Sequence, residues 1–483
     1  MIVHACLMLG MATSLADAEE KTAAVPRRPS VTRADMALAY QRFESAFLDH
    51  RPEGQGLVDA NLAFEAVTKS FFGMNFAAAI RQLNDKSLEM REQRRPSDEE
   101  RWLASLKVTV DPPIVVQSDV ARITVRPMYV TIDQPPAQVK VRLTSNSATR
   151  EFDLKFEKDA AGEWVGQGDI RRAGGSWEGT WKIAIKLPAG ITLDTGRTLQ
   201  GVARDLDSLR DENAVRLGKV AANNDALRAA LITCRARNEH LKMKPGEALS
   251  TEFLADYNIL APQVVQEIEQ LERGVDPYSK RKGDYWRIVA RGNTKVPMRV
   301  YVPEKLDWSK DVPVVIALHG AGGDENMFMD AYGQGALKRE ADRMGFIAVS
   351  PATFFFTSRS DMLEPLLADL ALCYPIDRKR VYVLGHSMGG GATTRLAIDK
   401  GSLLRAASCL AGFRGFPASA KVPPTYVVAA ELDAIIPAAG IELAAKKAID
   451  DKLPVTLEVV PHYGHTLVVE SKLADVIDWM WKQ

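Results

Sequence analysis

The chain has 483 residues, more than one ordinary domain holds, which predicts about two to four domains. Its 62 basic and 62 acidic residues cancel, and the longest basic runs are as short as Lys280-Arg281-Lys282, so the concentrated positive charge of a nucleic-acid-binding protein is missing. A hydrophobic content of 46% is ordinary for a globular protein and suffices for several cores.

The amino end has the pattern of an export signal. Residues 2–15 are mostly apolar and uncharged, and Ala16-Asp17-Ala18 supplies the small residues that a signal peptidase reads. We expect residues 1–18 to be removed by cleavage after about Ala18, giving a secreted or periplasmic protein; the alternative is an apolar start without a targeting role. The apolar stretch is too short to span a bilayer, and no other run approaches that length, so we expect no membrane span.

Three accessory segments follow a polar, proline-bearing stretch, residues 19–32, which predicts a flexible lead. Residues 33–95 place apolar side chains at helical spacing and predict a helical segment. Residues 97–203 contain about seven short alternating strands separated by Pro and Gly pairs, which favours a β-sandwich. An immunoglobulin-like topology stays open, because the Cys…Trp…Cys pattern of antibody domains is missing. Residues 204–275 return to a helical pattern and link to the last domain.

Residues 276–483 alternate strands with helices. This alternation predicts a mostly parallel sheet covered by helices. The first two strands have no helix between them, so they should form an antiparallel edge.

The strongest chemical signal is Gly385-His386-Ser387-Met388-Gly389, which fits the nucleophile elbow G-x-S-x-G. A predicted strand precedes it and a predicted helix follows it, as this motif requires. The turn is so tight that only glycine fits two residues to either side of the serine, and its strain lifts the hydroxyl above the sheet. Ser387 is therefore the predicted nucleophile; the alternative is a structural glycine-rich turn.

A serine nucleophile needs a base, and the chain order Ser…Asp/Glu…His is typical of this fold. His465 lies in the loop after the last strand, where the base belongs, and His462 is the alternative. Asp433 lies in the loop after the preceding strand and would orient the imidazole, with Glu431 as the alternative acid. His386 is expected to pack beside the elbow rather than to act as base.

The developing oxyanion needs backbone donors. A glycine-rich loop, residues 319–323, follows a predicted strand, and the N–H groups of Ala321 and Met388 are the expected pair. His319 is expected to anchor this loop. Three consecutive aromatic residues, Phe354, Phe355 and Phe356, follow another strand on the same side of the sheet. We expect them to line an apolar pocket beside the serine, or else one to pack inward and the others to meet the accessory segments.

The last two hundred residues resemble the α/β-hydrolases of the polyhydroxybutyrate-depolymerase and feruloyl-esterase branch, close to carbohydrate esterase family one. The resemblance lies in residues 319–323 (HGAGG), 374–382 (YPIDRKRVY) and 385–390 (GHSMGG). It implies a secreted serine esterase acting on polyesters or on phenolic or acetyl esters of polysaccharide. The odd number of cysteines after the predicted signal departs from that branch, whose members often carry disulfides, and favours buried free thiols.

Three functions are compatible with these patterns. The first is a carboxylic ester hydrolase that works through an acyl-enzyme, and the second is a prolyl-oligopeptidase-like serine peptidase. The third is a surface or polysaccharide-binding protein, in which Trp164, Trp177 and Trp181 of the predicted sandwich would stack on sugars; more often such residues fill a sandwich core. The sequence calls for no cofactor and no metal, since the motif H-E-x-x-H is missing. The expected partner is a small-molecule, polysaccharide or polyester ester.

Overall fold

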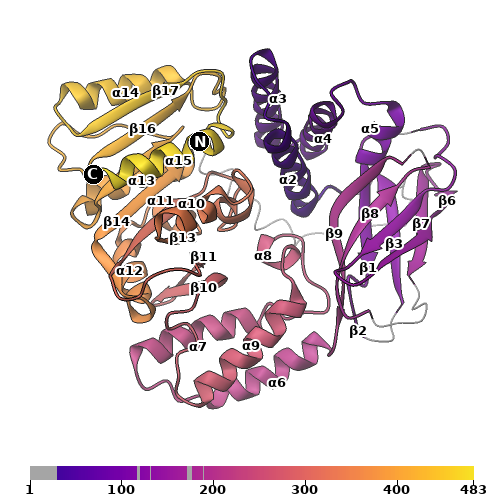
Figure 1. Cartoon of the computed structure of the whole chain (residues 1–483), viewed down its shortest axis with the longest axis horizontal. Coiled ribbons are helices and arrows are strands. Elements are labelled where there is room, and N and C mark those ends of the chain that lie inside the picture. Colours follow the sequence, from indigo (N-terminus) through magenta and orange to yellow (C-terminus); the bar gives the residue numbers. More distant parts are fainter. Residues whose placement is uncertain (1–29, 117–119, 131, 171–176, 189) are drawn as a thin grey trace, which may run out of the picture.

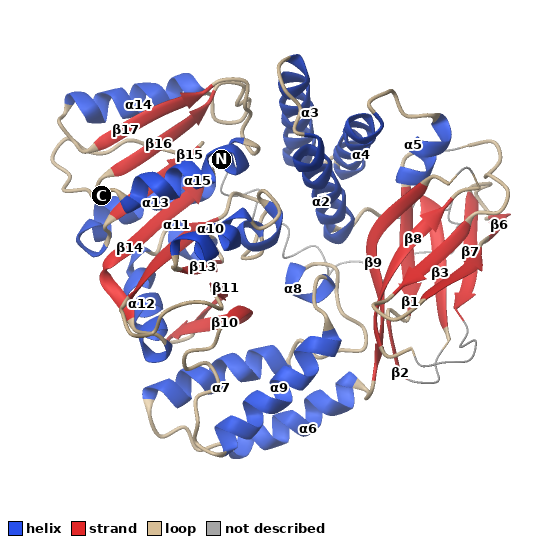
Figure 2. Ribbon diagram, in the orientation of Figure 1, coloured by secondary structure: helices blue, strands red, loops and turns tan. Residues whose placement is uncertain are grey.

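A computed structural model describes residues 30–483 apart from 117–119, 131, 171–176 and 189. The predicted export signal, residues 1–18, and most of the predicted lead lie outside the described residues. The chain forms a helical segment, a pair of β-sheets, a second helical segment and a large mixed α/β domain (Figure 1). Figure 2 shows that strands are confined to two of these parts and that helices cover the larger sheet.

The first segment consists of three helices, α2 (Arg33–His50), α3 (Gln55–Phe72) and α4 (Phe76–Glu92). Helix α2 begins at a capping box in which the Thr32 hydroxyl accepts from the backbone N–H of Asp35 and the Asp35 carboxylate accepts from that of Thr32. The apolar faces of the three helices meet at Phe43, Phe64 and Leu83, which are buried.

The second part begins with a short helix, α5 (Asp98–Ala104), where only strands were expected. Ser97 and Glu100 form a capping box at its start, and the buried Trp102 contributes to the sandwich core. Two sheets follow, with strand orders β1-β3-β7-β6 and β2-β9-β8-β4-β5. Their strands are β1 (Leu106–Asp111), β2 (Ile114–Val116), β3 (Ala121–Pro127), β4 (Lys140–Thr144), β5 (Thr149–Asp153), β6 (Lys155–Lys158), β7 (Trp164–Ile170), β8 (Gly179–Lys186) and β9 (Thr192–Val202).

The tryptophans of this part serve mainly its core. Trp177 and Trp181 are each 2% exposed, and the guanidinium of Arg150 lies 4.1 Å from the centre of the Trp177 ring. Trp164 is partly exposed, with Lys158 over its ring. Two of the three rings are therefore closed to a stacked sugar.

The second helical segment contains α6 (Leu206–Lys219), α7 (Asp225–Asn238), α8 (Ser250–Phe253) and α9 (Tyr257–Glu272). Helices α6, α7 and α9 share one apolar core with the edge of the large sheet. Inside this core the carboxylate of Glu267 accepts hydrogen bonds from Arg237, Arg281 and Tyr278, so its buried charge is compensated.

The last part is an eight-stranded sheet of order β10-β11-β13-β12-β14-β15-β16-β17. Its first two strands are antiparallel and have no helix between them, and from β13 onward all neighbours are parallel. The strands are β10 (Gly283–Arg291), β11 (Thr294–Val302), β12 (Val312–Leu318), β13 (Ile347–Pro351), β14 (Ile376–His386), β15 (Ala406–Leu410), β16 (Thr425–Ala430) and β17 (Val455–Val460).

Helices cover both faces of this sheet. Residues of β12 alternate between two cores: Val314 and Ile316 face the core that includes α12 and α13, while Val315 and Ala317 face the core that includes α10 and α15. The helical elements are η2 (Met327–Ala331), α10 (Ala336–Met344), α11 (Phe354–Thr357), η3 (Ser360–Met362), α12 (Leu363–Cys373), α13 (Met388–Lys400), η4 (Gly401–Leu403), α14 (Ala438–Asp450) and α15 (Val468–Trp481).

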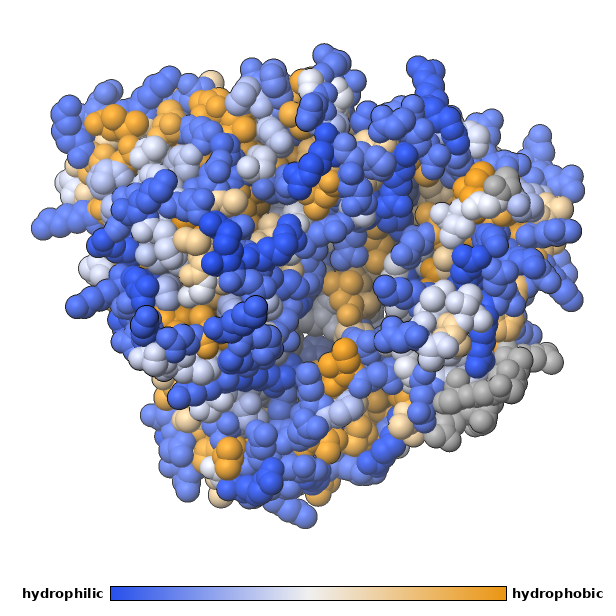
Figure 3. Space-filling model, in the orientation of Figure 1, coloured by the Kyte–Doolittle hydropathy of each residue, from blue (hydrophilic) through white to orange (hydrophobic). Residues whose placement is uncertain are grey.

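The first helical segment returns to contact the last domain, so the four parts close into a ring (Figure 1). Arg33 forms an ion pair of 2.9 Å with Asp324, and Arg197 of the sandwich donates to Asp35. The space-filling view shows a hollow in the middle of this face, with apolar side chains on part of its wall (Figure 3).

The described cysteines, Cys234, Cys373 and Cys409, are buried free thiols, as their spacing predicted. Across the described ranges, no helix combines the length and the apolar character that a bilayer crossing requires.

A buried acid at the contact between α2 and the last domain should make stability depend on pH. Glu44 is 1% exposed and accepts a hydrogen bond from the Tyr40 hydroxyl; burial raises its pKa to about 8. The folded chain therefore keeps this proton over a range in which the unfolded chain releases it. As pH rises from about 5 to about 8, the free energy of unfolding should fall by about 1.4 kcal/mol per pH unit through this group.

Glu44→Gln removes this titration. The thermal midpoints of variant and wild type are measured at several pH values across that range. As pH rises, the midpoint of the variant should increase relative to that of the wild type. Glu53→Gln, which removes an exposed carboxylate nearby, is the control. Its difference in thermal midpoint from the wild type should not depend on pH. A Glu44→Gln difference that stays constant with pH would contradict the prediction.

Candidate active site

Ser387 lies at the sharp turn between β14 and α13, in a backbone conformation with φ 55° and ψ −115° that residues other than glycine rarely adopt. A Cβ added to Gly385 would lie 2.2 Å from the carbonyl oxygen of Gly389, and one added to Gly389 would lie 1.9 Å from that of Leu318. Both positions of the motif are thus closed to any side chain. The Ser387 N–H donates to the carbonyl of Leu410, which ties the turn to β15.

Ser387, His465 and Asp433 form one hydrogen-bonded chain. The Ser387 hydroxyl lies 2.8 Å from Nε2 of His465, and Nδ1 of the same ring lies 2.7 Å from Oδ2 of Asp433. The other carboxylate oxygen, Oδ1, accepts the backbone N–H groups of Ile435 and Ile436 at 2.8 and 2.7 Å. These contacts fix the carboxylate in place, and the carboxylate in turn orients the imidazole. Because the carboxylate can only accept, Nδ1 of His465 is assigned as the N–H donor.

The alternative acid and base do not approach the serine. The backbone N–H of His462 donates to Glu431, and its ring lies 3.6 Å from the same carboxylate. The His462 side chain is 58% exposed, and that of Glu431 is 51% exposed. The structure thus brings together Ser387, Asp433 and His465 and leaves the other pair at the surface.

The glycine-rich loop lies beside Ser387. A Cβ added to Gly320 would lie 3.4 Å from Cβ of the serine, and Ala321 follows directly. Met388 is the first residue of α13, so its N–H has no acceptor within the helix and is available to an anion. His319 accepts the N–H of Thr353 at Nε2 and donates from Nδ1 to the carbonyl of Gly320. Burial lowers its pKa to about 4, so it is a neutral anchor of the loop.

His386, expected only to pack, connects this loop to the loop that bears His465. Its Nε2–H donates to the carbonyl of His465 at 2.8 Å, which leaves Nδ1 to accept from the hydroxyl of Tyr332 at 2.7 Å. The Tyr332 oxygen accepts the N–H of Gly320 through a long bond of 3.5 Å. Burial holds the pKa of His386 well below its usual range, so the ring stays neutral in this network.

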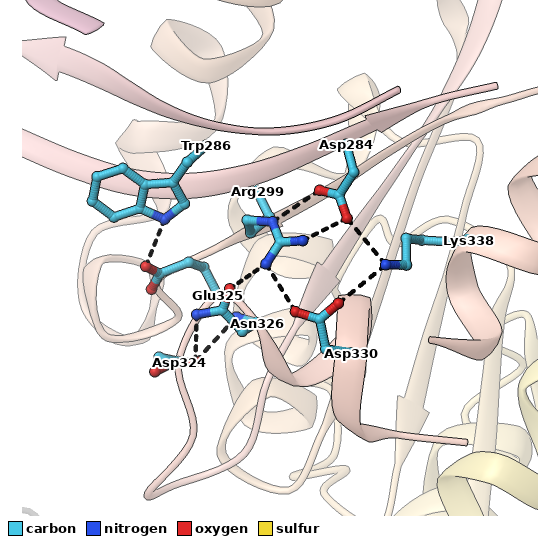
Figure 4. A network of polar contacts seen from close by, with 8 residues as sticks. All are labelled: Asp284, Trp286, Arg299, Asp324, Glu325, Asn326, Asp330 and Lys338. Carbon is cyan, nitrogen blue, oxygen red and sulfur yellow. Dashed lines mark hydrogen bonds and ion pairs between the residues drawn. The ribbon is translucent and has the colours of Figure 1, made fainter. Parts of the chain in front are cut away.

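The far end of the loop is held by charges (Figure 4). Arg299 of β11 pairs with Asp284 and Asp330, and Lys338 lies 3.0 Å from each of the same carboxylates. The guanidinium of Arg299 also donates to the side chain of Asn326. Each of the two cations thus pairs with both anions, and this cluster of four charges holds the end of the loop against the edge of the sheet.

The two residues before Asn326 have further partners. The side chain of Asp324 pairs with Arg33 of α2. Glu325 accepts the indole N–H of Trp286 at 2.8 Å (Figure 4). The loop is therefore anchored to the first helical segment as well as to β10 and β11.

The three phenylalanines point in different directions. Phe356 is fully buried in the sheet core and Phe355 packs against that core, so they offer little surface to a ligand. Phe354 is 45% exposed, and its ring lies 6.3 Å from that of His319. In the glycine-rich loop itself, a Cβ added to Gly322 would lie 2.4 Å from the ring of Phe71, which belongs to α3.

Sequence reasoning did not find the contribution of α3. Its side chains Asn61 and Glu65 hydrogen-bond to the backbone of the loops that carry His465 and Asp433. The available signal was a polar pair at spacing i, i+4 on the buried side of an amphipathic helix, flanked by Ala60 and Phe64. Such a pair indicates a polar partner without identifying it.

The elbow geometry predicts opposite outcomes for two neighbouring glycines. Gly389→Ala places Cβ against backbone that cannot move, so we expect loss of soluble folded protein or destabilisation by several kcal/mol. Gly391→Ala is the control, because its Cβ would meet only atoms of the flexible Arg414 side chain, the nearest of them Nε at 2.7 Å. Its thermal midpoint should stay near that of the wild type. Equal midpoints for the two variants would contradict this account of the turn.

Comparisons with known proteins place the C-terminal region among ester hydrolases. Residues 367–481 match the family described as "PETase: PET hydrolase-like". The chain is 31% identical over 120 residues to a feruloyl esterase B of Thermothelomyces thermophilus, covering 22% of this chain and 40% of that protein. It is 29% identical over 135 residues to a feruloyl esterase B of Neurospora crassa, covering 25% and 44%. The chain thus spans less than half the length of these curated relatives.

Among solved structures, an S-formylglutathione hydrolase of Staphylococcus aureus is 15% identical, with a TM-score of 0.35 over 42% of this chain and 98% of its own. A ferulic acid esterase, also 15% identical, has a TM-score of 0.36 over 41% and 98%. The sequence matches support a carboxylic ester hydrolase. They confirm the predicted resemblance of the C-terminal region to the feruloyl-esterase branch of the α/β-hydrolases.

Proposed function

We propose that the protein is a serine hydrolase that cleaves carboxylic esters through an acyl-enzyme, with Ser387 as nucleophile, His465 as base and Asp433 as the residue that orients the base. The observation that supports this most directly is the chain of hydrogen bonds of 2.8 and 2.7 Å at the strained turn. A serine hydroxyl is a weak nucleophile unless a neighbouring base removes its proton.

In the acylation step, Nε2 of His465 takes the proton of Ser387 as Oγ attacks the ester carbonyl carbon. The carbonyl π electrons move to oxygen, and the N–H groups of Ala321 and Met388 stabilise the oxyanion. When the tetrahedral intermediate collapses, the bond to the alcohol breaks and His465 donates its proton to the departing oxygen. Asp433 stabilises the imidazolium throughout.

In the deacylation step, a water molecule takes the place of the alcohol. His465 removes its proton, the hydroxide oxygen attacks the acyl carbon, and the carboxylic acid leaves as Ser387 regains its proton. The glycine-rich loop performs the same task for the second oxyanion. Its three anchors, on Arg33, Trp286 and Arg299, favour a loop that keeps its shape between the two steps.

The proposed substrates are esters with an aromatic group. The names of the relatives, feruloyl esterase and PET hydrolase, both refer to esters of aromatic acids. The exposed ring of Phe354 lies near His319 and the ring of Phe71 lies near Gly322, and both would provide apolar surface for such a group. We also propose export to the periplasm or beyond, with Glu19 as the first residue of the mature chain.

Substitution within the proposed triad tests the mechanism. Ser387→Ala should reduce kcat for para-nitrophenyl acetate by about a million-fold. His465→Ala should be nearly as damaging, and Asp433→Asn should cost on the order of ten-thousand-fold because the imidazole adopts the wrong tautomer. His462→Ala is the matched control and should retain its activity. A Ser387→Ala variant with a tenth of wild-type turnover would refute the proposal.

A substrate panel tests the proposed specificity. We expect hydrolysis of methyl ferulate and of para-nitrophenyl esters and no cleavage of a proline-containing peptide anilide. Phe354→Ala should lower kcat/KM for the feruloyl ester by about tenfold, mainly through KM, and leave the acetyl ester within a factor of about two, because only the larger group reaches the ring. Cleavage of the peptide at a rate comparable with the esters would favour the peptidase alternative.

A further inference from the structure

Helix α3 belongs to the first helical segment, yet two of its side chains accept hydrogen bonds from the loops of the proposed triad. Oε1 of Glu65 accepts the backbone N–H of His465 at 2.6 Å, and Oε2 accepts that of Ala434 at 2.8 Å. Oδ1 of Asn61 accepts the N–H of Gly464 at 2.8 Å. Asn61 is fully buried and Glu65 is 3% exposed, so both acceptor side chains are largely withdrawn from water.

One carboxylate therefore spans two loops. Ala434 follows the proposed acid directly, and the other N–H belongs to the proposed base itself. The loops also contact each other, through the N–H of Leu432 and the carbonyl of Tyr463 at 2.8 Å. Glu65 adds a second, charged link between them, and charge-assisted hydrogen bonds are stronger than neutral ones.

The backbone of His465 has partners on both sides that come from other parts of the chain. Glu65 accepts its N–H, and Nε2–H of His386 donates to its carbonyl. The ring is held independently by Asp433. Removing Glu65 would leave the buried N–H of His465 without an acceptor and would release the N–H of the exposed Ala434, and a loop avoids the first loss by moving.

The close approach of α3 needs a special residue in the loop. A Cβ added to Gly464 would lie 2.4 Å from Oε1 of Glu65, so only glycine permits the carboxylate to reach the next N–H. The Asn61 side chain is itself oriented, because its Nδ2 donates to the carbonyl of Leu57 at 3.0 Å. Burial raises the pKa of Glu65, although the N–H groups of Ala434 and His465 act in the opposite direction.

We infer that Glu65 and Asn61 are positioning residues for the triad, so that α3 is a working part of the active centre although it precedes the base by about four hundred residues. This inference rests on the proposed function. Neither side chain touches the reacting atoms. Each acts by fixing the position of the loops that carry His465 and Asp433. A displacement of about 1 Å at reacting groups can cost on the order of a hundredfold in rate.

The test compares full-length Glu65→Gln with Glu100→Gln. Both acids are 3% exposed and accept a backbone N–H, but Glu100 does so at the start of α5, from Ser97. A glutamine at position 65 offers one acceptor and turns an NH₂ group toward the second donor. We expect kcat for para-nitrophenyl acetate to fall about ten- to a hundredfold with KM changed by less than about twofold. Glu100→Gln should lose stability and retain kcat.

A spectroscopic readout separates positioning from general loss of stability. The low-field proton resonance of Nδ1–H in His465, which reports its hydrogen bond to Asp433, should shift or broaden in Glu65→Gln and stay unchanged in Glu100→Gln. Wild-type kcat together with an unchanged resonance in folded Glu65→Gln would overturn the inference.

Two further variants keep the outcome interpretable. If Glu65→Gln does not fold, Asn61→Ala removes the acceptor of the Gly464 N–H together with the bond to Leu57 within α3, and it should lower kcat about three- to tenfold; wild-type kcat would overturn the inference. Ser387→Ala in the same series tests the proposed function itself. If it stays active, the proposed function fails, whereas an inactive Ser387→Ala beside a fully active Glu65→Gln rejects only the role of α3.

Discussion

In the folded chain, the carboxylate of Glu65 accepts two backbone N–H groups in place of water. The arrangement of the whole chain depends on these two hydrogen bonds. A buried carboxylate without donors would cost several kcal/mol, so α3 and the two loops must stay together once they have met. Because α3 lies in the first helical segment and the two loops lie in the last domain, this contact closes a ring. The sandwich and the second helical segment span the distance between the two closed ends (Figure 1).

Polar contacts, rather than apolar ones, align the parts around the elbow. The glycine-rich loop is held by Arg33, Trp286 and Arg299, and the histidine loop by Glu65 and His386. Hydrogen bonds and ion pairs fix direction as well as distance, whereas apolar contacts tolerate sliding. The apolar cores provide most of the folding free energy, and the polar junctions define how the loops lie relative to Ser387.

The elbow could be predicted because its information is local: a glycine pattern, a strand before it and a helix after it. His465 and Asp433 followed from chain order in a parallel sheet, whose strand ends share one edge. The hydrogen bonds of Glu65 could not be predicted, because they join residues about four hundred positions apart. The sequence left open whether the three phenylalanines line a pocket together or one packs inward. Because α11 is helical and successive residues of a helix point about 100° apart, Phe356 is buried while Phe354 is exposed.

Closure of the chain on itself has a consequence for biosynthesis. Helix α3 is made about four hundred residues before Gly464, so Asn61 and Glu65 remain hydrated until the loop that carries Gly464 has emerged. Domains commonly fold in the order in which they emerge, and here the helices emerge before the loops that they will hold. The proposed hydrolytic activity is therefore absent until the loop that carries His465 has emerged, and a chain that stops before this loop leaves Asn61 and Glu65 without their polar partners.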